Sequence, residues 1–583
     1  MPCCGRARAW PATLPVSDIL AADMKQEIEQ AIAAMCKDVF DVAVEVELSR
    51  PDEQFGDYAT NVALRLSKPT GLNPRAVADQ LAQKIRDELG TKIADVSVAG
   101  PGFLNLKLHD ATLVQELGAN VSRSRDGQTV LVEYSDPNPL KPLHAGHLYT
   151  TLVGDAIARL VEHSGAKTVR INYGGDVGRH IGISLWAIMR ELGGEHPEKL
   201  TEIAEADRPA WLGARYVEGT NAFEDDAAAK AEILAVNKRV YQLHEAGDHD
   251  SPFAQIYWTV RQWSYDYFAE LYRQLKVVPF DRYIPESEVT PLGVKTVTEQ
   301  LEKGVFTKSD GAVVFEGDAH GLHTRVFINS EGLPTYETKD IGLSLTKWQD
   351  YHFDQSIIIT ANEQEQYMQV VLAAIKQFAP EPAERTHHLT HGMVKLQGGS
   401  KMSSRKGNIV TAIEILEAAR AAGAEMGTNP SEDTILAAVK YAFAKNRIGG
   451  DIIYDPKESI VLEGNSGPYL QYAHARARSI LQKASADTTS LPSDVAFELD
   501  ERRLLRKITE YVEVVERATN ELMPHHICTY LYELAQTFNS FYEHNRVIGS
   551  GDREKVRLSL VKLYADTLQI GLELLGITAP DHL

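Results

Sequence analysis

In His144-Ala-Gly-His147, two histidines lie three residues apart with an alanine and a glycine between them. Side chains of this type at this spacing are suited to binding phosphate groups. The motif follows a proline-punctuated loop at 136–143 and opens a segment with helical periodicity at 148–163. A helix N-terminus attracts anions through its free N–H groups and its dipole, and residues three apart share one side of the first turn. Gly146 leaves room for a nucleotide against the backbone. Taken alone, the pattern also fits histidines that cap a helix or pack in a core.

A second candidate is the cationic segment Lys401-Met-Ser-Ser-Arg-Lys-Gly-Asn408, which follows residues 398–400, Gly-Gly-Ser. The glycines favour a flexible loop, in which Lys401 and Lys406 carry charges suited to a triphosphate. Taken alone, such a charge run is usually a solvated loop. The two motifs together favour a nucleotide site.

Two sets of strand and helix patterns surround these motifs and predict the sheet that positions them. The first set is a strand, a helix and a strand at 130–134, 148–163 and 168–172. The second is a strand, a helix and a short strand at 355–360, 364–378 and about 391–396. This spacing indicates a nucleotide-binding sheet interrupted by an insertion.

The length of 583 residues indicates several domains, and we expect four segments. They are a disordered or misassigned leader at 1–23, a small α+β domain at 24–121, the nucleotide-binding domain at 122–430 with an insertion at about 190–325, and an all-helical domain at 431–583. Translation starting at Met24 would explain the leader, and a transit peptide is a less favoured alternative.

The composition excludes several classes of protein. Hydrophobic residues make up 44% and charged residues 24% of the chain, and no apolar stretch is long enough to span a bilayer, so we expect no membrane association. The net charge of −21 argues against generic coating of nucleic acid. The four cysteines form no zinc-binding or disulfide pattern, which favours the reducing cytoplasm.

The two motifs resemble the HIGH and KMSKS signatures of class I aminoacyl-tRNA synthetases, and the surrounding sequence narrows the resemblance to the arginyl-tRNA synthetase family. The segments that carry it are Val132-Glu-Tyr-Ser-Asp-Pro-Asn138, Gly154-Asp-Ala-Ile-Ala-Arg-Leu160, Asn172-Tyr-Gly-Gly-Asp-Val-Gly178, Phe55-Gly-Asp-Tyr-Ala-Thr-Asn61, Pro101-Gly-Phe-Leu-Asn105 and Gly467-Pro-Tyr-Leu-Gln-Tyr-Ala-His-Ala-Arg476. The resemblance covers residues 24–583. It implies a multidomain α/β fold: a class I Rossmann-like catalytic domain with an insertion, an N-terminal α+β domain that binds tRNA, and a C-terminal all-helical anticodon-binding domain.

The resemblance implies a ligase that activates arginine with ATP and transfers it to tRNA(Arg), releasing AMP and pyrophosphate. It also implies ATP bound as its Mg²⁺ complex, activation that requires tRNA, no tightly bound protein metal, and a cytoplasmic monomer. Two alternatives remain. One is a class I synthetase for another amino acid, and the other is a catalytically silent tRNA-binding paralogue.

For ATP binding and catalysis, the resemblance implies a set of eight residues. They are Lys141, His144, Gly146, His147, Met393, Lys401, Ser403 and Ser404. Ser404 stands where the family-wide loop pattern has a second lysine. In many arginyl enzymes a lysine just before the first motif substitutes for it, and Lys141 occupies that place. Lys406 is a rival, and a solvent-facing loop lysine is the alternative for Lys141.

A guanidinium needs a site with an anion and flat hydrogen-bond acceptors. Tyr336 and Asp340 are four apart and share one face if their segment is helical, although they also fit an ordinary surface helix. The family's arginine pocket resembles this pair. The resemblance adds Gln364, with Gln366 as the fallback, and assigns the substrate's α-amino and carboxylate groups to Glu133, Ser135 and Asn138. Asp136 receives no ligand role.

Two further groups are candidates for tRNA contact. By resemblance, Phe55, Tyr58 and Asn61 face the tRNA elbow. Aromatic and polar side chains suited to splayed anticodon bases are Tyr469, Gln471, Tyr472, His474 and Arg476. The alternative is an aromatic helix packed in the core. A basic stripe for phosphate contact, or for ordinary solvation, comprises Arg502, Arg503, Arg506 and Lys507.

Overall fold

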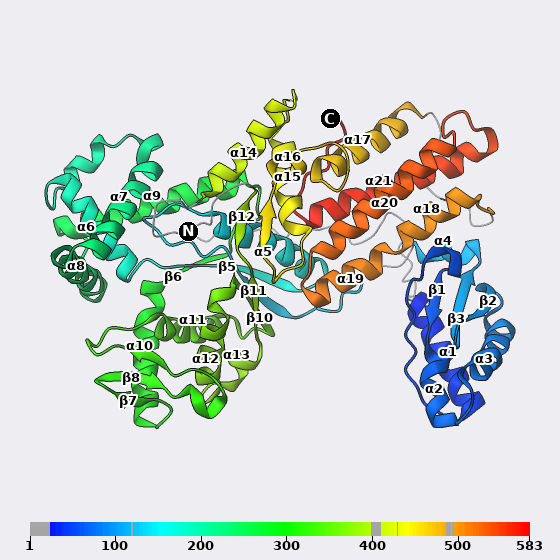
Figure 1. Ribbon diagram of the computed structural model, residues 1–583, viewed down its shortest axis with the longest axis horizontal. Coiled ribbons are helices and arrows are strands. Elements are labelled where there is room, and N and C mark those ends of the chain that lie inside the picture. Colours follow the sequence, from blue (N-terminus) through cyan, green and yellow to red (C-terminus); the bar gives the residue numbers. More distant parts are fainter. Residues whose placement is uncertain (1–23, 118–120, 398–409, 428, 485–490, 492–494) are drawn as a thin grey trace.

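The structure is a computed structural model that describes residues 24–117, 121–397, 410–427, 429–484, 491 and 495–583 (Figure 1). At its centre lies a five-stranded sheet in which every neighbouring pair is parallel. The strand order is β11 (Thr386–His391), β10 (Gln355–Ala361), β4 (Thr129–Glu133), β5 (Lys167–Gly174) and β6 (Arg282–Pro285). This is the predicted nucleotide-binding sheet.

Helices cover both faces of the sheet because the side chains of its strands alternate in direction. Val130 and Val132 pack with α5 (Ala145–His163), whereas Leu131 between them packs with Leu343 of α11 (Tyr336–Tyr351). Two more helices, α12 (Glu365–Lys376) and α13 (Pro380–Glu384), lie between β10 and β11 in the chain. The loops after β4, β5 and β10 therefore meet at the carboxyl edge of the sheet, where open α/β folds bind ligands.

The predicted insertion at 190–325 is wrong in one respect, because β6 lies inside it and pairs with β5. The strand is only four residues long and shows no clear alternation of polar and apolar residues, so its sequence does not predict a strand. The first insert is a helical layer of α6 (Arg179–Leu192), α7 (Arg208–Asp225), α8 (Ala227–Ala246) and α9 (Pro252–Gln274). The second contains α10 (Glu286–Glu302) and the antiparallel strands β7 (Thr307–Ser309), β8 (Ala312–Phe315) and β9 (Arg325–Ile328).

The core around the central sheet extends beyond the predicted boundary at 430. Ile435, Phe443 and Tyr454 share a buried cluster with the side of α5 that covers the sheet. The elements here are β12 (Val394–Leu396), α14 (Ala412–Glu425), α15 (Glu432–Ala444), β13 (Ile452–Tyr454) and α16 (Pro456–Ser459), and β12 pairs with β13. Helical periodicity continues across the true boundary, so it could not mark where one core ends.

The C-terminal domain is helical throughout its described part. Its helices are α17 (Gly467–Lys483), α18 (Leu499–Thr509), α19 (Tyr511–Glu521), α20 (His525–His544) and α21 (Glu554–Leu574). No helix of the described residues is long and apolar enough to cross a membrane.

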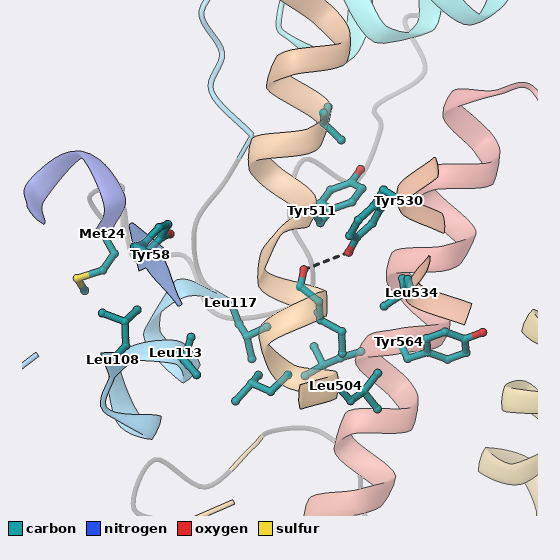
Figure 2. Packing of buried hydrophobic residues seen from close by; sticks show 14 of the residues in the cluster. Met24, Tyr58, Leu108, Leu113, Leu117, Leu504, Tyr511, Tyr530, Leu534 and Tyr564 are labelled. Atoms are coloured by element: carbon teal, nitrogen blue, oxygen red, sulfur yellow. Dashed lines mark hydrogen bonds between the residues drawn. The ribbon is translucent and has the colours of Figure 1, made fainter. Parts of the chain in front are cut away.

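The N-terminal domain is α+β, as predicted. It contains α1 (Met24–Phe40), β1 (Tyr58–Thr60), α2 (Val62–Thr70), α3 (Pro74–Leu89), β2 (Ile93–Ala99), β3 (Phe103–Leu108) and α4 (Asp110–Glu116), with an antiparallel sheet of order β1-β3-β2. The domain packs against the C-terminal helices (Figure 1). At this interface Leu113 and Leu117 lie opposite Leu504 of α18, as Figure 2 shows. The apolar contact fixes the N-terminal domain beside the helical domain.

Candidate active site

A cavity of about 520 Å³ opens at the carboxyl edge of the central sheet. Its lining includes four of the predicted ATP residues and all six predicted arginine residues. They are Lys141, His144, Gly146 and His147, and Glu133, Ser135, Asn138, Tyr336, Asp340 and Gln364. Segments more than 200 residues apart in the chain thus line one cavity. The residues predicted for both substrates therefore share one site.

The histidine motif forms the first turn of α5 and caps it. His144 Nδ1 accepts hydrogen bonds from the backbone N–H groups of Gly146 (3.1 Å) and His147 (3.4 Å), and His147 Nδ1 accepts one from the His144 N–H (3.4 Å). The capping interpretation is therefore correct. It does not exclude ligand binding, because a neutral ring that accepts through Nδ1 carries its proton on Nε2 and can donate there.

The two rings are held neutral. Burial lowers the pKa of His144 to about 4, helped by the positive charge of Lys141, and burial also places the pKa of His147 well below its ordinary value. The rings stack with their centroids 3.7 Å apart, which two imidazolium cations would resist. The start of α5 consequently offers N–H donors and a helix N-terminus to an anion, and this attraction does not depend on charged histidines.

Lys141 supplies a positive charge beside the histidines. Burial lowers the pKa of its ammonium group to about 8, and the carboxylate of Glu286 partly opposes that shift. Because the side chain lines the cavity, the alternative of a solvent-facing loop lysine does not hold. The competing residues Lys401 and Lys406 lie outside the described residues, as do Ser403 and Ser404.

Buried carboxyl groups also line the cavity. Burial raises the pKa of Asp340 to about 7; the hydrogen bond from the Tyr367 hydroxyl counteracts the rise, whereas Glu133 and Glu286 add to it. Glu286 is buried and pairs with Lys339 at 2.5 Å. Tyr336 is 52% exposed and lines the same cavity. A buried carboxyl group that ionises with difficulty gains most from a cationic partner.

The end of β4 leads into a compact polar turn. Glu133 forms a 2.7 Å ion pair with Lys347. Ser135, at φ 76°, hydrogen bonds through Oγ to the hydroxyls of Tyr272 (2.7 Å) and Thr151 (2.8 Å). Asp136, which the sequence analysis left without a role, also lines the cavity. The predicted amino-acid residues thus lie together, but Glu133 already has a cationic partner.

The cavity is also lined by residues that the sequence did not predict as site residues: Tyr173, Glu286, Arg325, Tyr367 and His391. Glu286 is the most important of them. It is the first residue of α10, directly after the short strand β6, inside the segment interpreted as an insertion. A carboxylate in the first turn of a helix is a common stabilising feature, so the pattern gave no reason to single it out.

Two predicted neighbours of the cavity differ in their placement. Both glutamines are exposed, but Gln364 lines the cavity, whereas Gln366, the fallback, is not among the lining residues described. Met393 is 55% exposed and lies outside this lining. Its backbone N–H donates to Asp451 and its carbonyl accepts from Ile452. Met393 therefore lies directly before β12 and is held against the start of β13.

The predicted tRNA residues fall into exposed and buried groups. Phe55 is 49% and Tyr472 46% exposed, and the surface also includes Asn61. Tyr469 and Arg476 are partly buried. In contrast, the side chains of Tyr58, Gln471 and His474 are buried in the protein.

For the buried group, the expectation of direct tRNA contact requires correction. Tyr58 donates to Glu116 of its own domain (2.9 Å) and to Glu513 of the C-terminal domain (3.2 Å). Gln471 and His474 hydrogen bond to the backbone carbonyl groups of Thr578 and Pro580. These side chains secure the packing of the protein itself. The alternative of a packed helix face is correct for Gln471 and His474.

The basic stripe on α18 is also committed to internal partners. Arg502 pairs with Asp57 at 2.7 Å, Arg503 with Glu53 at 2.6 Å, and Lys507 with Glu510 and Glu533, each at 2.7 Å. Arg506 pairs with Glu510 at 3.1 Å. The prediction of phosphate contact is therefore not supported, because these cations join the N-terminal and C-terminal domains or pair within the latter.

No group of three or more His, Cys, Asp or Glu side chains suited to a metal ion occurs within the part of the chain that the structure describes. A parallel sheet with a His-x-Gly-His helix start at its carboxyl edge, followed by a helical domain, defines a class I aminoacyl-tRNA synthetase. Models of three families match: "tRNA synthetases class I (R), catalytic domain" at 110–455, "DALR anticodon binding domain" at 470–583 and "Arginyl tRNA synthetase N terminal domain" at 22–108.

Named relatives agree with this. An arginine–tRNA ligase of Porphyromonas gingivalis is 30% identical over 96% of this chain and 99% of its own length, and one of Bacteroides fragilis is 32% identical over 93% and 96%. The solved arginyl-tRNA synthetase of Thermus thermophilus has a TM-score of 0.77 and 26% identity, covering 96% of this chain and 100% of that chain. The chain belongs to the arginyl-tRNA synthetase family.

Proposed function

We propose that this cavity binds arginine and ATP end to end, and that the protein there performs the reaction of its family, the joining of arginine to tRNA. The observation that carries this proposal is the polarity of the cavity. Neutral histidine donors and Lys141 line it together with the buried carboxyl groups of Asp340 and Glu286. A nucleotide phosphate complements the first group of residues, and a guanidinium complements the second, so the two substrates define two proposed ends.

In the first step, the arginine carboxylate attacks the α-phosphate of ATP in line and pyrophosphate leaves. This chemistry depends on alignment and on stabilising negative charge at the phosphate oxygens. His144 and His147 donate Nε2–H to those oxygens, and Lys141 stabilises the charge that develops at the α-phosphate. ATP enters as its Mg²⁺ complex. Lys401, Ser403 and Ser404, with Lys406 as the rival to Lys141, belong to the same proposal.

Arginine binds with its guanidinium between Asp340 and Glu286 and beside the phenol of Tyr336. A bidentate pair between a planar guanidinium and a carboxylate is strong and directional. Gln364 contacts the guanidinium from the opposite wall. Glu133, Ser135 and Asn138 hold the α-amino and carboxylate groups, which directs the carboxylate toward the histidine end. A substrate without a positive charge would give the Asp340 carboxyl group no cationic partner, which penalises other amino acids.

The arginine is then transferred to tRNA(Arg), and AMP is released. Exposed Phe55 and Asn61 in the N-terminal domain, and Tyr469, Tyr472 and Arg476 on α17, are the candidate tRNA contacts. A monomeric, cytoplasmic enzyme completes the proposal and follows the resemblance to the family.

The test is amino-acid-dependent exchange of pyrophosphate into ATP, measured for each standard amino acid with and without tRNA(Arg). Arginine should be the only amino acid that supports exchange, and exchange should require added tRNA. Exchange with a different amino acid would assign the pocket to another specificity. No exchange with any amino acid, in the presence of tRNA, would favour the silent paralogue.

A further inference from the structure

The Gly174–Gly178 loop, residues 174–178, connects the cavity to the helical insert through Asp176. Gly175 lines the cavity, and a Cβ there would lie 2.1 Å from Oδ1 of Asn138. The next side chain, Asp176, is fully buried. Its Oδ1 accepts from the Ser287 N–H (2.8 Å), and its Oδ2 accepts from the Ser287 hydroxyl (2.7 Å) and from Arg261 Nε (3.0 Å).

Asp176 caps a helix to which it does not belong. Helix α10 begins at Glu286, and its own N-cap residue, Pro285, makes no side-chain capping bond. The N–H of Ser287 is one of the donors that a helix start leaves without an intrahelical partner. Asp176 satisfies it and places a carboxylate at the positive end of the helix dipole. The cap therefore fixes the turn that carries Glu286.

Helix α10 in turn sets the position of α11. The two helices touch backbone to backbone: a Cβ on Gly293 would lie 2.1 Å from the Thr338 carbonyl oxygen, and one on Gly342 would lie 2.2 Å from that of Val289. The Glu286–Lys339 ion pair joins them beside the cavity. A shift at the start of α10 would consequently move the acidic end of the site.

On the side away from α10, Asp176 contacts α9 of the helical insert. Arg261 pairs with the Asp176 carboxylate at 3.0 Å, and the hydroxyl of Tyr257 donates to its backbone carbonyl oxygen at 2.9 Å. Tyr257 is also 2.8 Å from Nε2 of His244 on α8. These contacts compensate the buried charge and tie the insert to the wall of the cavity.

We propose that Asp176 is a positioning residue for arginine selectivity, which acts by capping α10 so that Glu286 faces the guanidinium. The inference rests on the proposed function and deepens it. Asp176 does not line the cavity, so it acts on substrate only through Glu286 and the helix pair. Arg261 makes this dependence sensitive to the placement of the helical insert.

The test compares steady-state kinetics of full-length wild-type and Asp176→Ala enzymes, with tRNA, ATP and varied arginine. A misplaced binding group commonly costs an order of magnitude or more, so we expect KM for arginine to rise at least about tenfold. The kcat and the KM for ATP should change less than about threefold. The preference for arginine over citrulline, its neutral analogue, should fall by a similar factor.

Three further variants separate positioning from general damage. Asp226→Ala removes an N-cap of the same type from α8, where Asp226 accepts from Ala228 N–H at 2.8 Å, and should lower Tm while leaving KM for arginine unchanged. Asp176→Asn retains a good capping side chain, so its KM should lie between those of wild type and Asp176→Ala. In a Glu286→Gln background, Asp176→Ala should add little further effect on KM.

Unchanged KM and unchanged citrulline discrimination in Asp176→Ala would overturn the inference. So would a parallel rise in the KM values for arginine and ATP, or full additivity with Glu286→Gln. If Asp176→Ala does not fold, Ser287→Ala, which removes only the hydroxyl contact, decides: a two- to threefold rise in KM for arginine supports the inference, and none refutes it. Absence of arginine-dependent exchange in the wild type would instead refute the proposed function.

Discussion

The two ends of the cavity are built in different ways. Among the described residues, the proposed phosphate end comes from one short stretch, Lys141 to His147, whose histidines cap their own helix and are kept neutral by burial. The guanidinium end comes from two separate helices, through Glu286 on α10 and Asp340 on α11. Within the described part of the chain, a local motif therefore supplies the phosphate-binding groups, whereas selection of a basic amino acid requires packing between elements that are distant in the chain.

The electrostatic strategies differ as well. At the phosphate end, cations are few and the helix start provides the attraction, so an anion need not displace an existing ion pair. At the guanidinium end, burial stabilises the protonated form of Asp340, and an arriving guanidinium offsets the cost of ionising it. Binding of arginine and binding of ATP should therefore respond differently to mutation and to pH.

The largest expected effect is on arginine binding. Asp340→Asn keeps the shape and a hydrogen-bonding partner for Tyr367 but removes the charge, and loss of one member of a buried pair costs about 100-fold or more in affinity. We expect KM for arginine to rise by that factor while KM for ATP changes little. Asp350→Asn, on the exposed end of the same helix, is the control. Equal losses for both substrates would contradict separate ends.

The second effect should appear at the phosphate end. Lys141→Ala removes a charge near the reacting phosphate and should lower the rate of adenylate formation about 30-fold, with a smaller change in ATP affinity. Single-turnover kinetics measures this rate directly. Lys406→Ala should be milder, and Lys167→Ala, on an exposed position of β5, should have no effect. A near-normal rate in Lys141→Ala with a slow Lys406→Ala would assign the role to Lys406.

The pH dependence should also differ between the ends. Asp340 must be ionised to bind a guanidinium, and its pKa is raised to about 7, chiefly by burial. KM for arginine should consequently fall about tenfold from pH 6 to pH 8, because about tenfold more of the free enzyme is ionised at the higher pH. The histidines, with lowered pKa values, stay neutral across this range. The same KM slope in Asp340→Asn would show that another group is responsible.

The smallest expected effect separates two neighbouring amides. Gln364 lines the cavity, whereas Gln366 is exposed outside it. Gln364→Ala should raise KM for arginine about threefold, the worth of one hydrogen bond, and Gln366→Ala should leave it unchanged. Steady-state kinetics with both variants checks the register directly, and the reverse pattern would favour Gln366.

The sequence predicted the phosphate end better than the acidic end for a physical reason. His144 and His147 are neighbours on one helical turn, so their geometry follows from local structure. Tyr336 and Asp340 were found in the same way, as a pair spaced along one helix. Glu286 was missed because its contact with Lys339 depends on how α10 packs on α11, and no periodicity encodes that.

Burial was the second limit on prediction. Gln471 and His474 have side chains suited to RNA, but on α17 they face Thr578 and Pro580 of the folded chain. The basic residues of α18 have similar spacing to a phosphate-binding stripe, yet Arg502 finds Asp57 in the N-terminal domain. Both cases require knowledge of which helix faces meet. Strand β6 was hidden for the related reason that four residues carry too little pattern.

The most direct test is a crystal structure of the full-length enzyme with arginine and a non-hydrolysable ATP analogue. The guanidinium should lie within hydrogen-bonding distance of Asp340 and Glu286, with the phosphates at the Nε2 atoms of His144 and His147 and the arginine carboxylate between them. A guanidinium bound away from both carboxylates, or a nucleotide bound away from the start of α5, would contradict a single two-ended site.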